Sequence, residues 1–231
     1  MQSVVFQGGE GAAVTAAQAV YEALRREILN LDLPPGTPLH RTALATKYGV
    51  SLTPLREAMA MLEQDGLVRI VPQSGTVVKR IDVPQLFETH FLRVAVETEV
   101  VRRLARQGGG EALRKARAIL KMQEALAGDT EQVAMFNDLD RSFHLALFAG
   151  LGMEGLHLML HRRLGHLARC QRLDLPSEGK MASILAHHGA ILDAIEAGDS
   201  EAATRAMREH LSGTIRRLDA LRAQVPEYFS G

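Results

Sequence analysis

The sequence has almost no cysteine and no long apolar segment, and both absences restrict what the protein can be. Cys170 is the only cysteine, so no disulfide can form within the chain, and we expect a reducing compartment. Residues 1–14 lack the basic start and apolar run of a signal peptide. No stretch approaches the roughly 20 apolar residues that span a bilayer. These features predict a soluble, cytoplasmic protein that does not bind membranes.

The chain also lacks net charge, because 27 lysines and arginines balance 27 acidic residues. A surface that binds a polyanion must therefore be a local patch. No internal repeat or low-complexity tract stands out. With 231 residues, 46% of them hydrophobic, the chain can form one large domain or two smaller ones with full cores.

Residues 1–15, rich in Gly, Gln and Ala, predict a flexible arm, and residues 16–81 predict a compact N-terminal domain. Apolar residues recur at helical spacing after Ala16 and stop at Pro34-Pro35-Gly36. Ser51 is a good N-cap for a later helix that tolerates Pro54 in its first turn. The predicted elements are helices over 16–33, 42–48 and 52–66, and strands over 67–71 and 75–79.

Three helices followed by a hairpin form the plan of a winged helix-turn-helix, whose third helix enters the DNA major groove. Arg56, one turn into helix three, can bond to a guanine edge in two places. The alternative is an ordinary packed helix with Arg56 as a solvated charge, since residues 16–80 carry only a slight basic excess. The predicted DNA-binding residues on the two helices and the wing are Arg41, Thr42, Ser51, Thr53, Arg56, Gly75 and Thr76.

Strand signals vanish after residue 82, and helix follows helix with short joints. We expect an all-α bundle over 82–224, which mediates dimerisation, and a C-terminal tail over 225–231. The fold class is therefore mainly α. The approximate helix spans are 83–107, 111–127, 130–149, 152–173, 177–197 and 199–222.

Four side chains on the apolar faces of three bundle helices form a candidate metal site. Asp140 and His144 are four residues apart and share one helix face. His188 and His210 lie among apolar residues of two later helices. Three imidazoles and a carboxylate suit zinc, nickel or another transition ion.

Each of these histidines alone is more commonly a hydrogen-bonded core residue than a ligand. His187 is about 100° away from His188 on an ideal helix, and spacing cannot exclude it as the ligand. His157 and His161 are also four apart, but their helix has no matching carboxylate and basic neighbours oppose a cation. We interpret this second pair as unrelated to a metal.

The N-terminal domain resembles the GntR family of bacterial regulators in almost every landmark. These are Pro35-Gly36-Thr37-Pro38-Leu39, Leu44-Ala45, Tyr48-Gly49-Val50-Ser51, Thr53-Pro54-Leu55-Arg56-Glu57-Ala58, Leu62-Glu63-Gln64-Asp65-Gly66-Leu67-Val68, Gly75 and Val77. Two positions depart from the pattern. Leu52 stands where the family usually has an arginine, and Thr42 stands where a further arginine is common, with Arg41 beside it. The family's usual base preference should not be assumed.

The bundle resembles the FCD ligand domain of the FadR subfamily. The matching segments are Leu92-Arg93-Val94-Ala95-Val96-Glu97, Asp140-x-x-Phe143-His144, residues 188–199 and Ala206-Met207-Arg208-Glu209-His210-Leu211. Six helices resemble the VanR-like branch. The resemblance implies that Asp140, His144, His188 and His210 hold a divalent ion, with zinc first and nickel or manganese as alternatives. It also implies that Arg93 pairs with a small carboxylate effector, although an intrahelical pair with Glu97 is the simpler role. Two departures, His187 for a common Glu and Gly152-Met153 for a common Gly-Asn, remove no ligand.

The resemblance implies a homodimeric repressor that binds a double-stranded DNA operator and releases it when the effector binds. A second hypothesis is a metal-dependent, hydrolase-type enzyme. However, no motif places a general base beside the metal ligands, and this hypothesis gives residues 1–80 no role. A third reading is a regulator that senses the metal itself. Operator binding after chelation, at fixed effector, distinguishes the two kinds of regulator. A metal sensor responds to the metal alone, whereas a metabolite sensor needs the acid as well.

Overall fold

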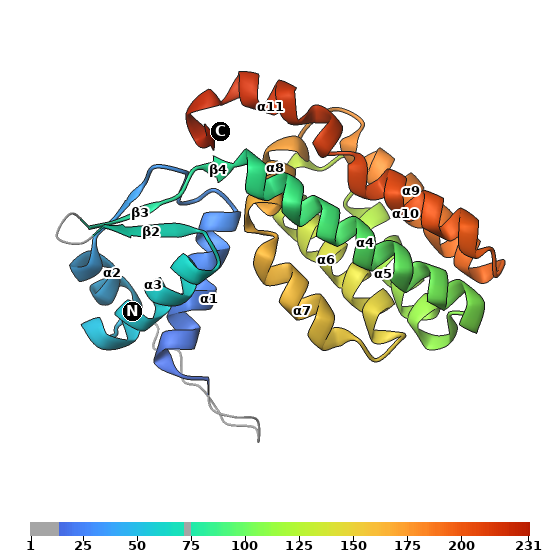
Figure 1. The fold of residues 1–231 in the computed structure, drawn as a ribbon, viewed down its shortest axis with the longest axis horizontal. Coiled ribbons are helices and arrows are strands. Elements are labelled where there is room, and N and C mark those ends of the chain that lie inside the picture. Colours follow the sequence, from blue (N-terminus) through green and yellow to red (C-terminus); the bar gives the residue numbers. More distant parts are fainter. Residues whose placement is uncertain (1–13, 72–74) are drawn as a thin grey trace.

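The computed structural model describes residues 14–71 and 75–231 of the chain, as a smaller N-terminal head beside a larger helical bundle (Figure 1). The predicted arm thus lies outside the described residues except for Val14 and Thr15, and so does the tip of the wing at 72–74. The mainly α fold class is confirmed. None of the helices in the described part is both long and apolar enough to cross a membrane.

The head contains the three predicted helices and the predicted hairpin strands. Thr15 caps the first helix by accepting a hydrogen bond from the backbone N–H of Gln18, and Gly49 ends the second helix in a left-handed conformation with φ 65°. The elements are α1 (Ala16–Leu29), β1 (Pro38–Leu39), α2 (Arg41–Tyr48), α3 (Leu52–Gln64), β2 (Val68–Val71) and β3 (Gly75–Val78). The short strand β1 was not predicted.

The three strands form an antiparallel sheet in the order β1-β3-β2, with Leu39 opposite Thr76 and Arg69 opposite Val77. Helices α1 and α3 pack together on this sheet around an aliphatic core. Leu24, Ile28 and Leu62 are fully buried in it. The periodic apolar residues of the sequence therefore form the core, and the first turns of α3 are left exposed.

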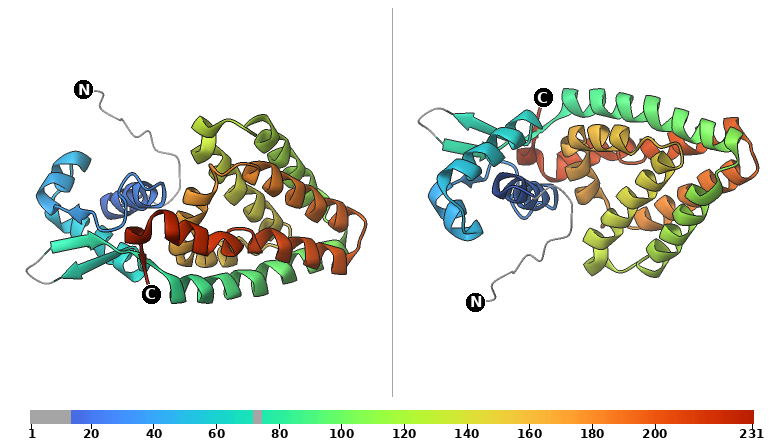
Figure 2. Two further views of the ribbon diagram at one scale, coloured as in Figure 1. Left: turned by 90° about the horizontal axis from the view of Figure 1, so that it is seen from above. Right: turned by 90° about the horizontal axis from the view of Figure 1, so that it is seen from below.

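The bundle is organised around α4, which runs along its length (Figures 1 and 2). Asp82 caps this helix by accepting a hydrogen bond from Gln85 N. The elements are α4 (Val83–Gln107), α5 (Gly110–Ala125), η1 (Thr130–Gln132), α6 (Val133–Ala149), α7 (Glu154–Arg163), α8 (Gly165–Asp174), α9 (Lys180–Glu196), α10 (Ser200–Ser212), η2 (Ile215–Arg217) and α11 (Leu218–Gln224).

Two helices predicted as continuous are each divided in the structure. The helix predicted over 152–173 breaks at Leu164 into α7 and α8. Gly165, the first residue of α8, packs against the head so closely that an added Cβ would lie 2.6 Å from Leu67 Cδ2. The helix predicted over 199–222 ends at Ser212, and a 3-10 turn separates it from α11. A single glycine within a helical pattern is a weak stop signal, so the first break was missed.

The predicted C-terminal tail contains ordered structure. Residues Pro226–Tyr228 form the turn η3, and β5 (Phe229–Ser230) pairs in parallel with β4 (Ile81–Asp82). Phe229 is buried against Ile81 and Cys170. Burial also raises the pKa of Cys170 to about 12, which keeps this thiol protonated. The C-terminus therefore returns to the junction between head and bundle (Figure 1).

Polar contacts from α8 and the end of α7 attach the head to the bundle. Arg169 Nη1 donates to the carbonyl of Lys79 at 2.6 Å, and His166 Nδ1 accepts from Asp82 N at 3.0 Å. Arg25 Nη2 donates to the carbonyl of His161 at 2.9 Å. Helices α7 and α8 thus both contact the head.

Candidate metal centre

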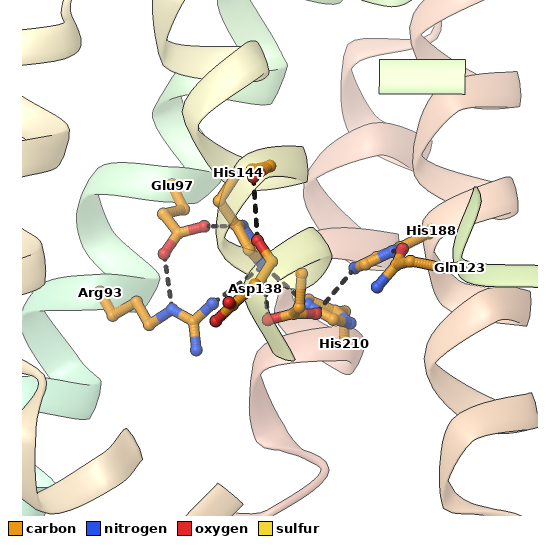
Figure 3. Close-up of polar contacts among 9 residues, drawn as sticks. Arg93, Glu97, Gln123, Asp138, His144, His188 and His210 are labelled. Atoms are coloured by element: carbon orange, nitrogen blue, oxygen red, sulfur yellow. Dashed lines mark hydrogen bonds and ion pairs between the residues drawn. The ribbon is translucent and has the colours of Figure 1, made fainter. Parts of the chain in front are cut away.

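The four predicted ligands meet in the interior of the bundle. Helix α6 presents Asp140 and His144 one turn apart, while α9 and α10 bring His188 and His210 from the other side. One donor atom from each side chain lies within 4.8 Å of those of the other three. His144 Nε2 is 3.1 Å from His210 Nε2, and His188 Nε2 is 3.3 Å from Asp140 Oδ1. Side chains from three helices thus converge on one point, and Figure 3 shows its three histidines.

Two polar side chains orient the outer nitrogens of the imidazoles. Gln123 Oε1, from α5, lies 2.9 Å from His188 Nδ1, and Glu97 Oε2, from α4, lies 2.5 Å from His144 Nδ1. A ring that donates its Nδ1–H to such an acceptor exposes the Nε2 lone pair, which is the tautomer a metal requires. The Phe143 ring stacks on His188 at a centroid distance of 3.7 Å and further fixes that imidazole.

Arg93 lies at the edge of this cluster and contacts two of its members. Its Nε is 2.6 Å from Glu97 Oε1, so the predicted intrahelical pair is present. Its Nη2 is 2.9 Å from His144 Nε2. The guanidinium therefore contacts both the Glu97 carboxylate and the Nε2 atom of His144 (Figure 3).

Burial and mutual contacts shift the pKa values of these groups. Burial lowers the pKa of His188 and lowers that of His210 well below its usual range. Burial alone would raise the pKa of Asp140, but its close contact with His188 and the nearby imidazoles hold it well below its usual value. Arg93 and His144 likewise overcome burial and lower the pKa of Glu97 to about 2. Lowered pKa values of the two carboxyl groups, and of His188 and His210, favour the deprotonated side chains that a cation needs.

The residues present fit a divalent ion. Asp140 Oδ1 and His188 Nε2, which face each other at 3.3 Å, are buried without a hydrogen-bond partner among the described residues. Unpartnered buried polar atoms are destabilising. In a tetrahedral site with N and O ligands about 2.0–2.2 Å from zinc, neighbouring donors lie about 3.3 Å apart. The 3.1 and 3.3 Å separations are close to that value.

The structure also separates the other histidines from this cluster. His187 is half-buried, and its ring centroid is 6.2 Å from that of His210. It is not among the residues that could hold the ion, whereas His188 is. His157 and His161 are near each other on α7, with centroids 5.9 Å apart, and they line a small cavity next to Arg93 and His144.

The DNA-binding candidates of the head are exposed, except for Arg41 and Thr76. Ser51, Thr53 and Arg56 are exposed at the start of α3, beside Leu52, which is 43% exposed. Ser51 stands at the predicted N-cap without making a side-chain capping bond. On α2, Thr42 is exposed and Arg41 half-buried. Gly75 is exposed with φ 115°.

Thr76 was placed wrongly. Its side chain is only 3% exposed, because alternate residues of β3 face the interior. Its backbone is also paired, opposite Leu39 on one side and Ile70 on the other. Thr76 therefore supports the wing from inside and is removed from the predicted DNA contacts.

Sequence reasoning did not identify several polar residues that complete the site or the domain junction. Gln123 carried no motif or spacing signal that linked it to His188. Glu97 was recognised only as a partner of Arg93 four residues away, and its contact with His144 depends on tertiary packing. Arg25 and Arg169, both buried, gave no distinguishing signal in the sequence.

Comparisons with known proteins match both halves of the chain. Residues 16–78 match the model of bacterial regulatory proteins of the gntR family, and residues 88–213 match the FCD domain. An uncharacterized HTH-type transcriptional regulator in an unstable DNA locus of Streptomyces ambofaciens is 34% identical over 94% of this chain and 90% of its own length. The HTH-type transcriptional repressor RspR of Escherichia coli is 30% identical over 92% of this chain and 93% of its own. The solved structure of E. coli McbR/YncC superposes with a TM-score of 0.74 over 91% of this chain and 99% of that one, at 22% identity, which supports the fold alone.

Proposed function

The chain belongs to the GntR family of DNA-binding transcription regulators with an FCD domain, and from this premise we propose that it is a repressor controlled by a small carboxylate that binds beside a divalent ion in the bundle. The observation that carries the proposal is the convergence of Asp140, His144, His188 and His210 within 4.8 Å. A named repressor, RspR, is among its full-length relatives. We place the protein in the cytoplasm, where it can meet DNA.

The ion we propose is zinc, with nickel and manganese as alternatives. Three imidazoles and one carboxylate form a donor set that zinc prefers. When bound, the ion would supply a positive charge that attracts a carboxylate. Glu97 and Gln123 keep His144 and His188 in the required tautomer by accepting from their Nδ1 atoms.

Arg93 is the residue we assign to the effector. Its Nη2 contacts a ring nitrogen of His144, which is a weaker partner than a carboxylate. Glu97 holds the Nε side and so fixes the direction of the guanidinium. A carboxylate that approaches the centre can therefore bind to a pre-oriented arginine.

The head supplies the DNA contacts. We propose that Ser51, Thr53 and Arg56 enter the major groove, while Arg41, Thr42 and the backbone at Gly75 contact phosphates. Leu52, exposed at the same tip, can contact a thymine methyl group but cannot donate a hydrogen bond. The operator should accordingly differ from those read by relatives with an arginine there.

We propose a homodimer that binds a two-fold symmetric operator. The α4 helix carries an exposed apolar surface suited to a second copy of the chain. Phe87 and Phe91 are one turn apart on it, 47% and 75% exposed, and Leu92 adjoins them at 40%. Large apolar side chains grouped on one helix face are common at subunit interfaces.

The test measures operator binding with the metal and the acid varied independently. The full-length protein is stripped with chelator, reloaded with zinc, and titrated onto a duplex that it has selected from a random DNA pool. With zinc present, an effective acid from a carboxylate panel should weaken binding about 5- to 150-fold, the range of typical allosteric coupling. Zinc alone producing the whole change would instead identify a metal sensor.

Adjacent histidines give a matched pair of variants. His188→Ala should lose both bound zinc and the response to acid, because His188 Nε2 faces the cluster. His187→Ala should retain both, because His187 is half-buried and outside the cluster. Unchanged zinc content in His188→Ala, or its loss in His187→Ala, would contradict the ligand assignment.

A further inference from the structure

The cavity beside the metal centre is too small for most ligands. Its volume is about 40 Å³, and Arg93, His144 and His157 are among its lining residues. A second cavity, against Asp140 and His210, is smaller still at about 20 Å³. One water occupies roughly 30 Å³ in the liquid, whereas small-molecule sites commonly enclose roughly 300–1,000 Å³. The metal-side cavity can therefore take a carboxylate group but not the carbon skeleton attached to it.

A much larger crevice adjoins this cavity. It has a volume of about 580 Å³ and lies between α1 of the head and α6 and α7 of the bundle. Arg141, His157 and His161 line both spaces. The crevice and the cavity are therefore neighbours separated by these three side chains. The crevice is large enough for the carbon skeleton that the cavity cannot hold.

The crevice carries an excess of positive charge. Four arginines line it, namely Arg25, Arg26, Arg141 and Arg162, against the acidic residues Glu22 and Asp138. Asp138 already forms an ion pair with Arg141. Burial, followed by the repulsion of nearby arginines, lowers the pKa of His161 to about 2. A ligand in this crevice is therefore expected to be an anion.

Arg25 is a crevice arginine with a buried N–H that no acceptor satisfies. Its side chain is 8% exposed, and its Nε is buried without a hydrogen-bond partner among the described residues. Its nearest carboxylate oxygen, Asp65 Oδ2, is 3.8 Å from Nε and accepts a hydrogen bond from the Tyr21 hydroxyl at 2.5 Å. A buried guanidinium N–H without an acceptor is destabilising, and an anionic oxygen would satisfy it.

We infer that the effector is an elongated acid with two anionic groups, one at Arg93 and the metal centre and the other at Arg25 in the crevice. This inference rests on the proposed function and adds the chemical class of the effector. The carbon chain of the ligand, between its two anionic groups, passes Arg141, His157 and His161, which line both spaces. One molecule then contacts both the bundle and the head.

Such a ligand acts directly on the junction of the two domains. Arg25 belongs to α1 of the head and donates through Nη2 to the carbonyl of His161 at the end of α7. A second anionic group that binds the Nε of Arg25 lies next to this contact. The position of the head on the bundle thereby depends on the effector, which gives the DNA response a physical cause.

The test compares each dicarboxylate with its own half-amide, which keeps the length and polarity but loses one charge. Succinate, adipate and suberate and their half-amides are titrated calorimetrically into the zinc-loaded full-length protein. Above a threshold length, the diacid should bind about tenfold more tightly than its half-amide, as expected for a charged hydrogen-bonded pair. Equal affinities at every length would overturn the inference.

Variants locate the second group. Arg25→Gln should reduce the advantage of the diacid to less than about threefold. Because Arg25 is buried, the exposed pair Arg26→Gln/Arg162→Gln provides a second variant, and it should also reduce the advantage. The control Arg106→Gln/Arg163→Gln removes the same charge from exposed positions outside the crevice and should change nothing. An advantage that survives both crevice variants would overturn the inference.

The failure of this inference is distinguishable from the failure of the proposed function. Zinc-dependent binding of half-amides and diacids with equal affinity would leave the proposed function intact and remove only the second anionic contact. Binding that is equally tight after chelation would instead overturn the proposed function.

Discussion

The interior of the head is built from aliphatic side chains such as Leu24, Ile28 and Leu62, whereas the interior of the bundle encloses Arg93, Asp140 and three histidines. The head contacts its ligand from the surface, so its core can be devoted to packing. The bundle is proposed to bind its ligand inside. Its core therefore contains polar groups that are destabilising unless they are paired. The comparison implies that the stability of the head does not depend on a ligand inside it, whereas the stability of the bundle depends on what it binds.

Asp140→Asn should have the largest effect on the zinc-loaded protein. A bound ligand at about 1,000 times its Kd stabilises a protein by about 4 kcal/mol, and this increment should vanish when the carboxylate ligand is lost. Thermal unfolding with and without zinc measures it. A variant that still gains the full increment from zinc would show that Asp140 is not a ligand.

Leu62→Ala should destabilise the head by about 3 kcal/mol, because it leaves a cavity in a fully packed core. The loss should be the same with zinc and with chelator. Hydrogen exchange of amides in α1 and α3 reports on the head separately from the bundle. A loss that depended on zinc would break the proposed contrast between the two cores.

Gly165→Ala should destabilise the junction by about 1–3 kcal/mol, since the new Cβ would lie 2.6 Å from Leu67 Cδ2 and force the head and α8 apart. Gly155→Ala is the matched control on α7, where an added Cβ meets nothing within 4 Å. That control should be neutral or stabilising by about 0.5–1 kcal/mol. Chemical denaturation of both variants gives the difference.

Acid should weaken the bundle and the junction more than the head. Burial lowers the pKa of His157 to about 4 and that of His166 to about 3, with the repulsion of neighbouring charges adding to it. Below pH about 6.5 the unfolded chain binds protons that these folded imidazoles do not, so stability falls as the pH drops from 6.5 toward those values. Glu97, with its pKa lowered to about 2, adds a loss only below pH about 4.5.

The expected size is on the order of 1 kcal/mol per pH unit. Amide exchange of the zinc-free protein at pH 7, 6 and 5 should rise in α7 and α8 before it rises in α1 and α3. The head has no counterpart to these buried histidines in its described part, because His40 is exposed. Equal acceleration in all four helices would contradict the prediction.

Arg56→Ala should change stability least, by less than about 0.5 kcal/mol, because the side chain is exposed. Operator affinity should nevertheless fall by about 10- to 100-fold, since a bidentate contact with guanine contributes roughly 1–3 kcal/mol. Arg114→Ala, an exposed arginine of α5, is the control. Unchanged affinity would remove Arg56 from the reading surface.

Much of the architecture could be predicted because local patterns carried it. The spacing of apolar residues located α1, α4 and α9, and Gly49 located the end of α2, whereas α1 ends at Leu29, before the predicted proline stop. The i, i+4 pair of Asp140 and His144 is likewise a local feature. The split of α7 from α8 was missed because Gly165 is required by contact with Leu67 of the other domain. The inward orientation of Thr76 was missed because its backbone pairs on both sides.

By itself, the sequence determined the order of the helices, the division of apolar and polar faces and the family to which the chain belongs, since these depend on neighbours within a few turns. Tertiary structure alone selected His188 rather than His187, joined Glu97 and Gln123 to the imidazoles, and formed the arginine-lined crevice between α1 and α7. The physical reason is range. Helix periodicity acts over a few residues, whereas a coordination centre and a domain junction are formed by side chains that only the folded chain brings together.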